Sequence, residues 1–250
     1  MAVSGAKPTG ATDEAAAAAA VREMFDGIAP RYDRLNHILS LNVDRVWWWR
    51  TARRFRHILA RPEAAVLDLC CGTGDMTMAL RRLRPADGLP ILAADFSHQM
   101  LVRGAAKFAQ QRPGRSTAIA LEADALHLPL ADGSVDLITT AFGFRNLANY
   151  RAGLKEFHRV LRQGGELGIL DFSEPGGLLG KLYSFYFRRI LPAIGSRLSG
   201  VAGPYAYLPS SVHNFPAPAE LLGTMRELGF GEGSWTPYTF GVAGLYRAVK

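Results

Sequence analysis

Cysteine is scarce in this sequence, which limits the chemistry that the chain can carry. Cys70 and Cys71 are the two cysteines among 250 residues, and they are adjacent. A disulfide between neighbouring residues is strained, and neither cysteine has a second Cys or a His at the spacing of a metal site. We therefore expect no structural disulfide and no bound metal, in a protein suited to the reducing cytoplasm.

Long apolar runs are also missing. No run reaches the roughly 18 to 20 residues that a transmembrane helix needs, although 48% of the residues are hydrophobic. Residues 1–12 are small and polar, and no basic flank precedes the alanines at 15–20, which argues against a signal peptide. We expect a disordered tail over residues 1–20, followed by a single domain over residues 21–250.

Acidic residues are absent between Glu174 and Glu220, and the whole chain carries a net charge of +7. A positive balance is typical of proteins that meet nucleic acids or anionic membranes. The acid-free interval mixes basic residues with many aromatic and aliphatic ones, which suits a helix lying on a membrane surface. A buried helix with a solvated basic edge is the alternative. The basic residues in question are Lys181, Arg188, Arg189 and Arg197.

Apolar strands alternate with amphipathic helices after Pro62, which predicts a parallel sheet with helices on both faces. Two closing strands can come from residues 229–249. The expected strands before them are 64–69, 90–94, 117–121, 134–140 and 165–171, and the expected helices are 75–84, 97–110, 150–162 and 217–228.

Two helical segments are expected outside this alternation. Helices at 21–29, 33–41 and 43–59 would form an N-terminal lid over residues 21–61. An insertion over residues 175–215 would contain a helical segment at 178–200. The predicted fold class is therefore α/β, with a lid and an inserted helical segment.

Residues 66–75, with the sequence VLDLCCGTGD, join a buried strand to a Gly-x-Gly turn and a helix. Glycine lets a backbone turn sharply and lets a ligand approach it closely. Asp68 lies where this strand ends. Asp95 ends the next strand, where a carboxylate can accept hydrogen bonds from ribose hydroxyls. This pattern predicts a nucleoside site.

A dinucleotide site is disfavoured because it needs a third glycine, and Thr77 occupies that position. Asp75 at the helix start would repel a pyrophosphate, but it could accept hydrogen bonds from an amino-bearing or cationic ligand. S-adenosylmethionine carries both an ammonium and a sulfonium. The spacing of Asp68, Gly72 and Gly74 resembles the first motif of the class I methyltransferases, whose Rossmann-like sheet has seven strands, the last of them antiparallel.

Other candidate residues follow the third and fourth strands. Asp124 and Ala125 could contact an adenine amino group and ring edge. The fourth strand ends without the Asn/Asp-Pro-Pro-Tyr/Phe motif of enzymes that methylate nucleic acid bases, which disfavours that substrate. Arg145 lies just past this strand, where a substrate oxyanion could sit. A structural arginine is the alternative.

The chain resembles the ubiquinone/menaquinone biosynthesis C-methyltransferase family (UbiE/MenG) from about Met24 to Val249. The resemblance extends across the lid, the glycine turn, the fourth strand tip and the fifth strand. It rests on Met24-Phe25-Asp26, Arg31-Tyr32-Asp33, Leu67-Asp68-Leu69, Gly72-Thr73-Gly74-Asp75, Phe142-Gly143-Phe144-Arg145-Asn146, Arg159-Val160-Leu161-Arg162 and Phe172-Ser173.

The resemblance implies S-adenosylmethionine as the cofactor, held by Thr73, Asp95, Asp124 and Ala125 together with the glycine turn. Ala141 stands where the family commonly has a serine, so a side-chain contact is lost there. The implied reaction is C-methylation of a polyprenyl quinol, either demethylmenaquinol or the ubiquinone precursor. The implied catalytic residues are Arg145 for the phenolate, and Tyr32 and Asp33 for positioning or proton removal.

The substrate is membrane-dissolved, so we expect a cytoplasmic protein that can attach peripherally to the inner face of the plasma membrane. A homodimer is compatible with the sequence. Another phenol or lipid is the alternative substrate. An RNA-binding module would also suit the positive charge, but the chain lacks aromatic-basic strands of the RNA-recognition type, and we expect no nucleic acid partner.

Overall fold

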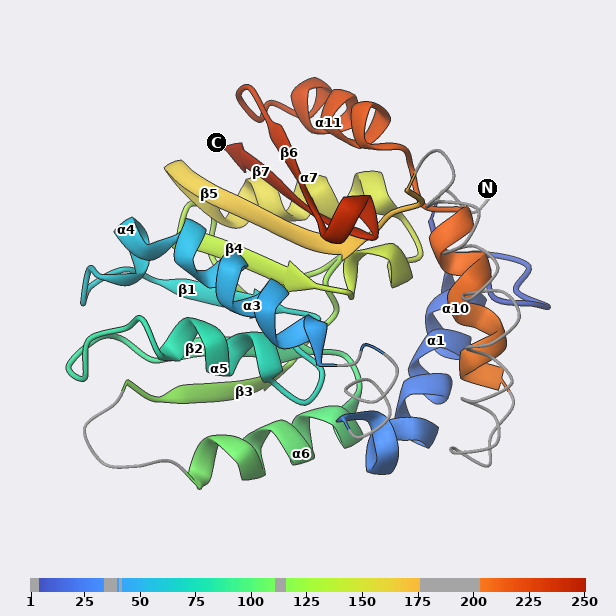
Figure 1. Cartoon of the computed structure of the whole chain (residues 1–250), viewed down its shortest axis with the longest axis horizontal. Coiled ribbons are helices and arrows are strands. Elements are labelled where there is room, and N and C mark those ends of the chain that lie inside the picture. The colour runs from blue at the N-terminus through green and yellow to red at the C-terminus, as the bar shows by residue number, and fades with distance from the viewer. Residues whose placement is uncertain (1–4, 34–39, 41, 111–115, 176–202) are drawn as a thin grey trace.

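Seven strands form one mixed sheet in the order β3-β2-β1-β4-β5-β7-β6 (Figure 1). The computed structural model describes residues 5–33, 40, 42–110, 116–175 and 203–250. The first five strands are parallel, and β7 pairs antiparallel with both β5 and β6. The predicted seven-stranded sheet with its antiparallel last strand is therefore confirmed. The strands are β1 (Val66–Leu69), β2 (Ile91–Asp95), β3 (Ala118–Glu122), β4 (Val135–Ala141), β5 (Leu161–Phe172), β6 (Ser234–Tyr238) and β7 (Ala243–Val249).

Helices cover both faces of the sheet and its carboxyl-terminal edge (Figure 1). One face packs under α3, α4 and α5, where Trp47, Phe55 and Leu80 are buried. The other packs under α7 and α11, where Phe157 and Met225 are buried. The α-helices are α1 (Glu14–Ile28), α3 (Val43–Arg54), α4 (Arg56–Leu59), α5 (Asp75–Arg81), α6 (His98–Ala109), α7 (Tyr150–Val160), α10 (Gly203–His213) and α11 (Pro218–Glu227), and the 3-10 turns are η1 (Ala29–Arg31), η2 (Phe144–Asn146) and η4 (Thr239–Gly241).

Helix α1 starts earlier than the sequence predicted. It begins at Glu14 instead of Val21, so the expectation of a disordered tail over residues 1–20 is wrong for its last part. Asp13 caps the helix by accepting a hydrogen bond from the Ala16 amide at 2.8 Å. The alanines that follow have the highest helix propensity, and Ala17 is fully buried. The polar composition of the first residues therefore did not show where the first helix begins.

Three other expected helices either differ from the structure or lie outside the described residues. The helix expected at 43–59 breaks at Phe55 into α3 and α4, because the Phe55 ring is fully buried where the two short helices meet the sheet. The helices expected at 33–41 and 178–200 lie almost entirely outside the described residues. Among the residues that were placed, no helix is long and apolar enough to cross a membrane.

The carboxyl ends of β1, β2, β4 and β5 meet at one edge of the sheet, because these strands are parallel. Helices α1 and α10 lie side by side across this edge (Figure 1). Ligands of open α/β sheets bind outside the carboxyl ends of the strands. The topology therefore places a candidate site between the strand tips and α1.

Candidate active site

A cavity of about 300 Å³ lies between the carboxyl-terminal strand tips and α1. The sequence predicted several of its lining residues, although they are spread over more than a hundred positions. The carboxylate that ends β2 and the one that follows β3 both reach this cavity, while its remaining wall is mostly apolar. The predicted residues that line it are Tyr32, Gly72, Asp95, Asp124, Ala125 and Ala141.

The two glycines of the turn after β1 have different roles. Both have positive φ angles, 55° at Gly72 and 86° at Gly74, which favour glycine over any other residue. Gly72 lines the cavity. Gly74 faces α6 instead, because a Cβ atom at this position would overlap the ring of Phe108. The third glycine of a dinucleotide fold serves this kind of close packing, and here Gly74 serves it.

Asp68 supports the strand tips from outside the cavity lining. Its side chain is fully buried, and it accepts hydrogen bonds from the hydroxyls of Thr77 at 2.5 Å and Thr139 at 2.8 Å. Burial raises its pKa to about 7, although both hydroxyls oppose the rise. Asp68 thereby joins β1, β4 and α5, and it is not among the residues that line the cavity.

Asp95 ties the glycine turn to the end of β2. Its Oδ2 atom accepts a hydrogen bond from the Gly72 amide at 2.8 Å, and its Oδ1 atom accepts one from the Ser97 amide at 2.9 Å. Burial raises its pKa to about 6, and these backbone hydrogen bonds lower it. A carboxylate oxygen has a second lone pair, so Asp95 can still accept hydrogen bonds from two adjacent hydroxyls.

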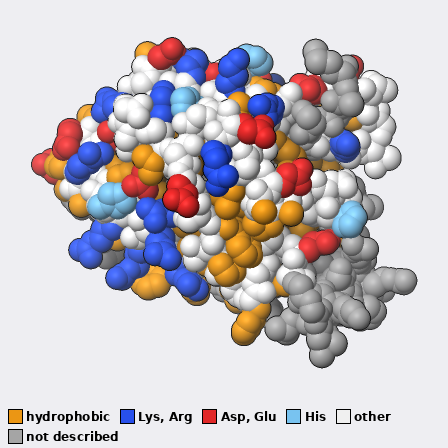
Figure 2. All heavy atoms as spheres, turned by 90° about the horizontal axis from the view of Figure 1, so that it is seen from above, with side chains coloured by type: hydrophobic (Ala, Val, Ile, Leu, Met, Phe, Trp, Pro, Cys, Tyr) orange, Lys and Arg blue, Asp and Glu red, His pale blue; other side chains and the backbone are white. Residues whose placement is uncertain are grey.

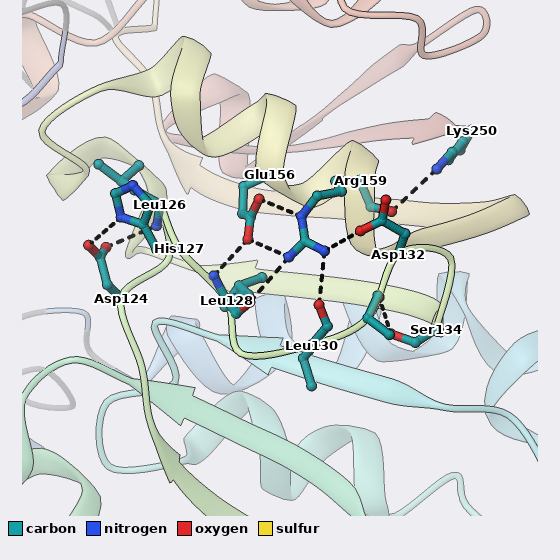
Figure 3. A network of polar contacts seen from close by, with 11 residues as sticks. Asp124, Leu126, His127, Leu128, Leu130, Asp132, Ser134, Glu156, Arg159 and Lys250 are labelled. Carbon is teal, nitrogen blue, oxygen red and sulfur yellow. Dashed lines mark hydrogen bonds and ion pairs between the residues drawn. The ribbon is translucent and has the colours of Figure 1, made fainter.

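The loop that carries Asp124 and Ala125 is held rigidly against α7 (Figure 3). Asp124 accepts a hydrogen bond from the Leu126 amide at 2.9 Å, and its other oxygen lies 3.2 Å from His127. Farther along the loop, the Arg159 guanidinium donates to the carbonyls of Leu128 and Leu130 and pairs with Glu156 and Asp132. Arg159, the first residue of the Arg159-Val160-Leu161-Arg162 motif, therefore holds the loop beside the cavity.

Asp33 lies in a polar cluster beside the glycine turn. The Lys107 ammonium on α6 is 2.7 Å from Asp33 Oδ2, 2.8 Å from Asp75 Oδ1 and 3.1 Å from the Thr73 hydroxyl. Thr73 in turn donates a hydrogen bond to Asp33. The candidate residues Asp33 and Thr73 are therefore brought together, but outside the cavity lining, with Lys107 as a partner that the sequence analysis missed.

Arg145 is also outside the cavity lining. Its side chain is 7% exposed and pairs with the fully buried Asp171, with 2.9 Å between Nη1 and Oδ1. Burial raises the pKa of Asp171, and the Arg145 charge opposes that rise. Arg145 also donates a hydrogen bond to the Phe142 carbonyl, which holds Phe142 at a positive φ of 59°. The pair therefore shapes the tip of β4.

Several cavity residues have no counterpart among the predicted site residues. Helix α1 and the segment after it form a roof, because Ala18, Ala19, Arg22 and Phe25 all line the cavity with Tyr32. Asn146 lines the opposite wall, and its buried Oδ1 atom has no hydrogen-bond partner in the part of the chain that the structure describes. A signal for Asn146 was present, since it follows Arg145 in a recognised motif. The lid expected over residues 21–61 includes Arg22 and Phe25, but no local signal placed Ala18 and Ala19 over the site.

The cavity fits the nucleoside cofactor that the sequence predicts. Asp95 and Asp124 present acceptors for ribose hydroxyls and an amino group. Leu69, Phe96, Met100 and Leu126 supply apolar surface for a purine ring. A ligand that carries one flat base and several hydroxyls satisfies both kinds of wall.

Comparisons with known proteins agree with this geometry. The model of the ubiE/COQ5 methyltransferase family matches residues 12–250. A demethylmenaquinone methyltransferase of Deinococcus radiodurans is 45% identical, with 92% of each chain covered. A ubiquinone/menaquinone biosynthesis C-methyltransferase of Geotalea daltonii is 40% identical, with 92% of this chain and 96% of that protein covered. A solved SAM-dependent methyltransferase of Thermotoga maritima matches with a TM-score of 0.62 at 18% identity, covering 91% of this chain and 99% of that one, and shares the fold.

Proposed function

Because the chain belongs to the ubiE/COQ5 methyltransferase family, we propose that it methylates a ring carbon of a polyprenyl quinol, with demethylmenaquinol as the first substrate to test. The cofactor is S-adenosylmethionine, which supplies an electrophilic methyl group on a sulfonium sulfur. The observation that carries the proposal is one cavity in which Asp95 and Asp124 lie with the open tip of β4 and with Asn146. One compartment can thus hold a nucleoside and an aromatic ring together.

The reaction needs alignment more than it needs acid–base strength. A quinol ring carbon becomes nucleophilic when the neighbouring hydroxyl loses its proton. The new bond joins that carbon to the methyl group, the methyl–sulfur bond breaks, and the ring hydrogen leaves as a proton. Holding carbon, methyl and sulfur in line can account for much of the rate. The rigid loop at Asp124 and the buried strand tips provide such a frame.

Asn146 is our candidate for contact with the substrate hydroxyl. Its Nδ2 atom donates to the Phe142 carbonyl at 3.3 Å, which fixes the amide and leaves the Oδ1 atom as an acceptor at the cavity wall. Arg145 acts one step further away, by holding the same carbonyl. Arg145, which the sequence analysis expected to contact the phenolate, is thus a positioning residue in this proposal. Tyr32 forms part of the cavity wall beside Gly72.

A direct assay tests the function. The full chain, S-adenosylmethionine and a short-tail demethylmenaquinol should give a product heavier by one methylene, as measured by mass spectrometry. The variant Asn146→Leu, which keeps the size of the side chain and removes the acceptor, should give less product. Methylation of other phenols or lipids, with no conversion of either demethylmenaquinol or the ubiquinone precursor, would favour the alternative substrate class.

A membrane-dissolved substrate requires the enzyme to meet the bilayer. Residues 178–200 supply basic and aromatic side chains without acidic ones, and we propose that this segment, which lies outside the described residues, attaches peripherally to anionic lipid. Replacing Lys181, Arg188, Arg189 and Arg197 with Gln should weaken vesicle binding, and high salt should have the same effect.

A further inference from the structure

We infer that one face of the protein, formed by α3 and η4, docks onto an anionic lipid bilayer. This inference rests on the proposed quinol substrate, and it adds a described surface to the segment at 178–200. We call it the α3–η4 surface. It comprises Arg45, Val46, Trp49, Arg53, Arg54 and Phe240.

Helix α3 presents a stripe of apolar and basic side chains to solvent. Val46 and Trp49 are each 51% exposed, and they stand one helical turn apart. Arg45, Arg53 and Arg54 flank them and are exposed. The Arg53 guanidinium lies 4.8 Å from the Trp49 ring centroid. The opposite side of the helix packs on the sheet, so folding does not require the exposed stripe.

Phe240 adds a third exposed apolar group. It is 81% exposed, and it sits in a left-handed conformation with φ of 57°, directly after Thr239 with φ of 45°. Such conformations cost free energy for residues other than glycine, and they concentrate at functional positions. The turn is fastened to α3, because Trp47 Nε1 donates to the Thr239 hydroxyl at 2.8 Å. The strained turn therefore holds an aromatic ring in water beside α3.

The charge of this surface is unbalanced. Arg45, Arg53 and Arg54 form no ion pair with any residue that the structure describes, whereas Arg151, which is also exposed, pairs with Glu227. The acidic residue of α3, Asp44, is buried at 4% exposure. Anionic headgroups would supply the missing negative charge, and the interfacial region would accept the aromatic rings. A bilayer satisfies both features at once.

The surface lies next to the active site. Trp47 packs against Phe142, with 5.7 Å between ring centroids, and Phe142 lines the cavity. In Figure 1, α3 and η4 face the reader, and Figure 2 turns this side to the lower edge, where basic side chains gather at the left beside hydrophobic ones. A docked enzyme would therefore hold the cavity close to the headgroup level, where a quinol ring emerges from the bilayer.

Vesicle binding tests the inference with the full chain. Sedimentation with phosphatidylglycerol/phosphatidylcholine vesicles should show binding that weakens at high salt. The variant Trp49→Ser/Phe240→Ser and the variant Arg45→Gln/Arg53→Gln/Arg54→Gln should each bind at least about tenfold more weakly. The matched control is Val102→Ser/Arg103→Gln, which removes an exposed apolar and an exposed basic residue of α6 and should bind as the wild type does.

Three outcomes would decide against the surface. Both variants binding vesicles like the wild type would overturn it, as would a dimer that the same substitutions dissociate, or equal binding to pure phosphatidylcholine. Methylation of a soluble short-tail quinol should persist in both variants. A wild type that binds vesicles through these residues but methylates no quinol would instead refute the proposed function and leave the docking surface standing.

Discussion

Lys107 and Asp33 join α6 to the segment that follows the roof of the cavity, with 2.7 Å between Nζ and Oδ2. The same ammonium reaches Asp75 at 2.8 Å, at the start of α5. One lysine therefore fastens the N-terminal segment to the glycine turn. Because this ammonium bridges both carboxylates to α6, its removal should loosen the roof and leave the chemical step little changed.

Replacing Lys107 with Met should raise the KM and the Kd for S-adenosylmethionine by roughly tenfold, the scale of about 1.4 kcal/mol, while kcat changes little. Calorimetry and steady-state kinetics measure the two effects. Lys155→Met, at an exposed position of α7, is the control and should leave both values unchanged. A loss confined to kcat would show that the cluster acts in the chemical step instead.

Substitutions at the two glycines should separate folding from binding. Gly74→Ala should destabilise the protein, because the new Cβ atom would overlap Phe108 as well as strain the backbone. At Gly72→Ala the new Cβ atom would meet nothing closer than 3.9 Å, on the Tyr32 ring, and only the backbone at φ of 55° would be strained. This variant should therefore lose less stability than Gly74→Ala, and it should also weaken cofactor binding. Urea unfolding and calorimetry check the contrast. Partial recovery of stability in Gly74→Ala/Phe108→Leu is also expected, and its absence would leave backbone strain as the whole cause.

Cofactor affinity should depend on pH through Asp95. Burial raises the pKa of this carboxyl to about 6. Above that pH it is ionised and can accept hydrogen bonds from ribose hydroxyls, whereas below it the proton removes acceptor capacity. The Kd for S-adenosylmethionine should therefore rise as pH falls through about 6. Asp95→Asn should bind more weakly at pH 7.5 and show a flatter profile between pH 5 and 7. An identical profile in the variant would assign the titration to another group.

The buried pair of Arg145 and Asp171 should show strong coupling. Arg145→Met leaves a fully buried carboxylate without its partner, which should cost about 3–5 kcal/mol in the free energy of unfolding. Arg145→Met/Asp171→Asn should recover much of that stability. Turnover of the double variant should stay low, by at most about 10²-fold, the scale for losing a direct oxyanion donor, because Arg145 acts only through the Phe142 carbonyl. Denaturation and product assays measure both, and full turnover in the double variant would make the pair purely structural.

Local sequence patterns were enough to predict the central strands of this protein and the turns at their ends. The strand at 66–69, the glycine turn and the carboxylates at Asp68, Asp95 and Asp124 follow from apolar runs and from the residues that end them, because each signal lies within a few neighbouring positions. Parallel pairing then forces the strand ends to one edge. The parallel part of the sheet and the position of the site were therefore predictable before any contact was known, whereas the antiparallel last strand was expected only from the resemblance to the class I methyltransferases.

Only the tertiary structure decided what several of these residues do. Gly74 packs on Phe108, Lys107 pairs with Asp33, and Arg145 pairs with Asp171. Each of these partners is separated by tens of positions, so spacing and composition could not reveal them. Burial and charge neutralisation act through space, and they moved Asp68 and Arg145 out of the cavity lining while bringing Asn146 and α1 to it.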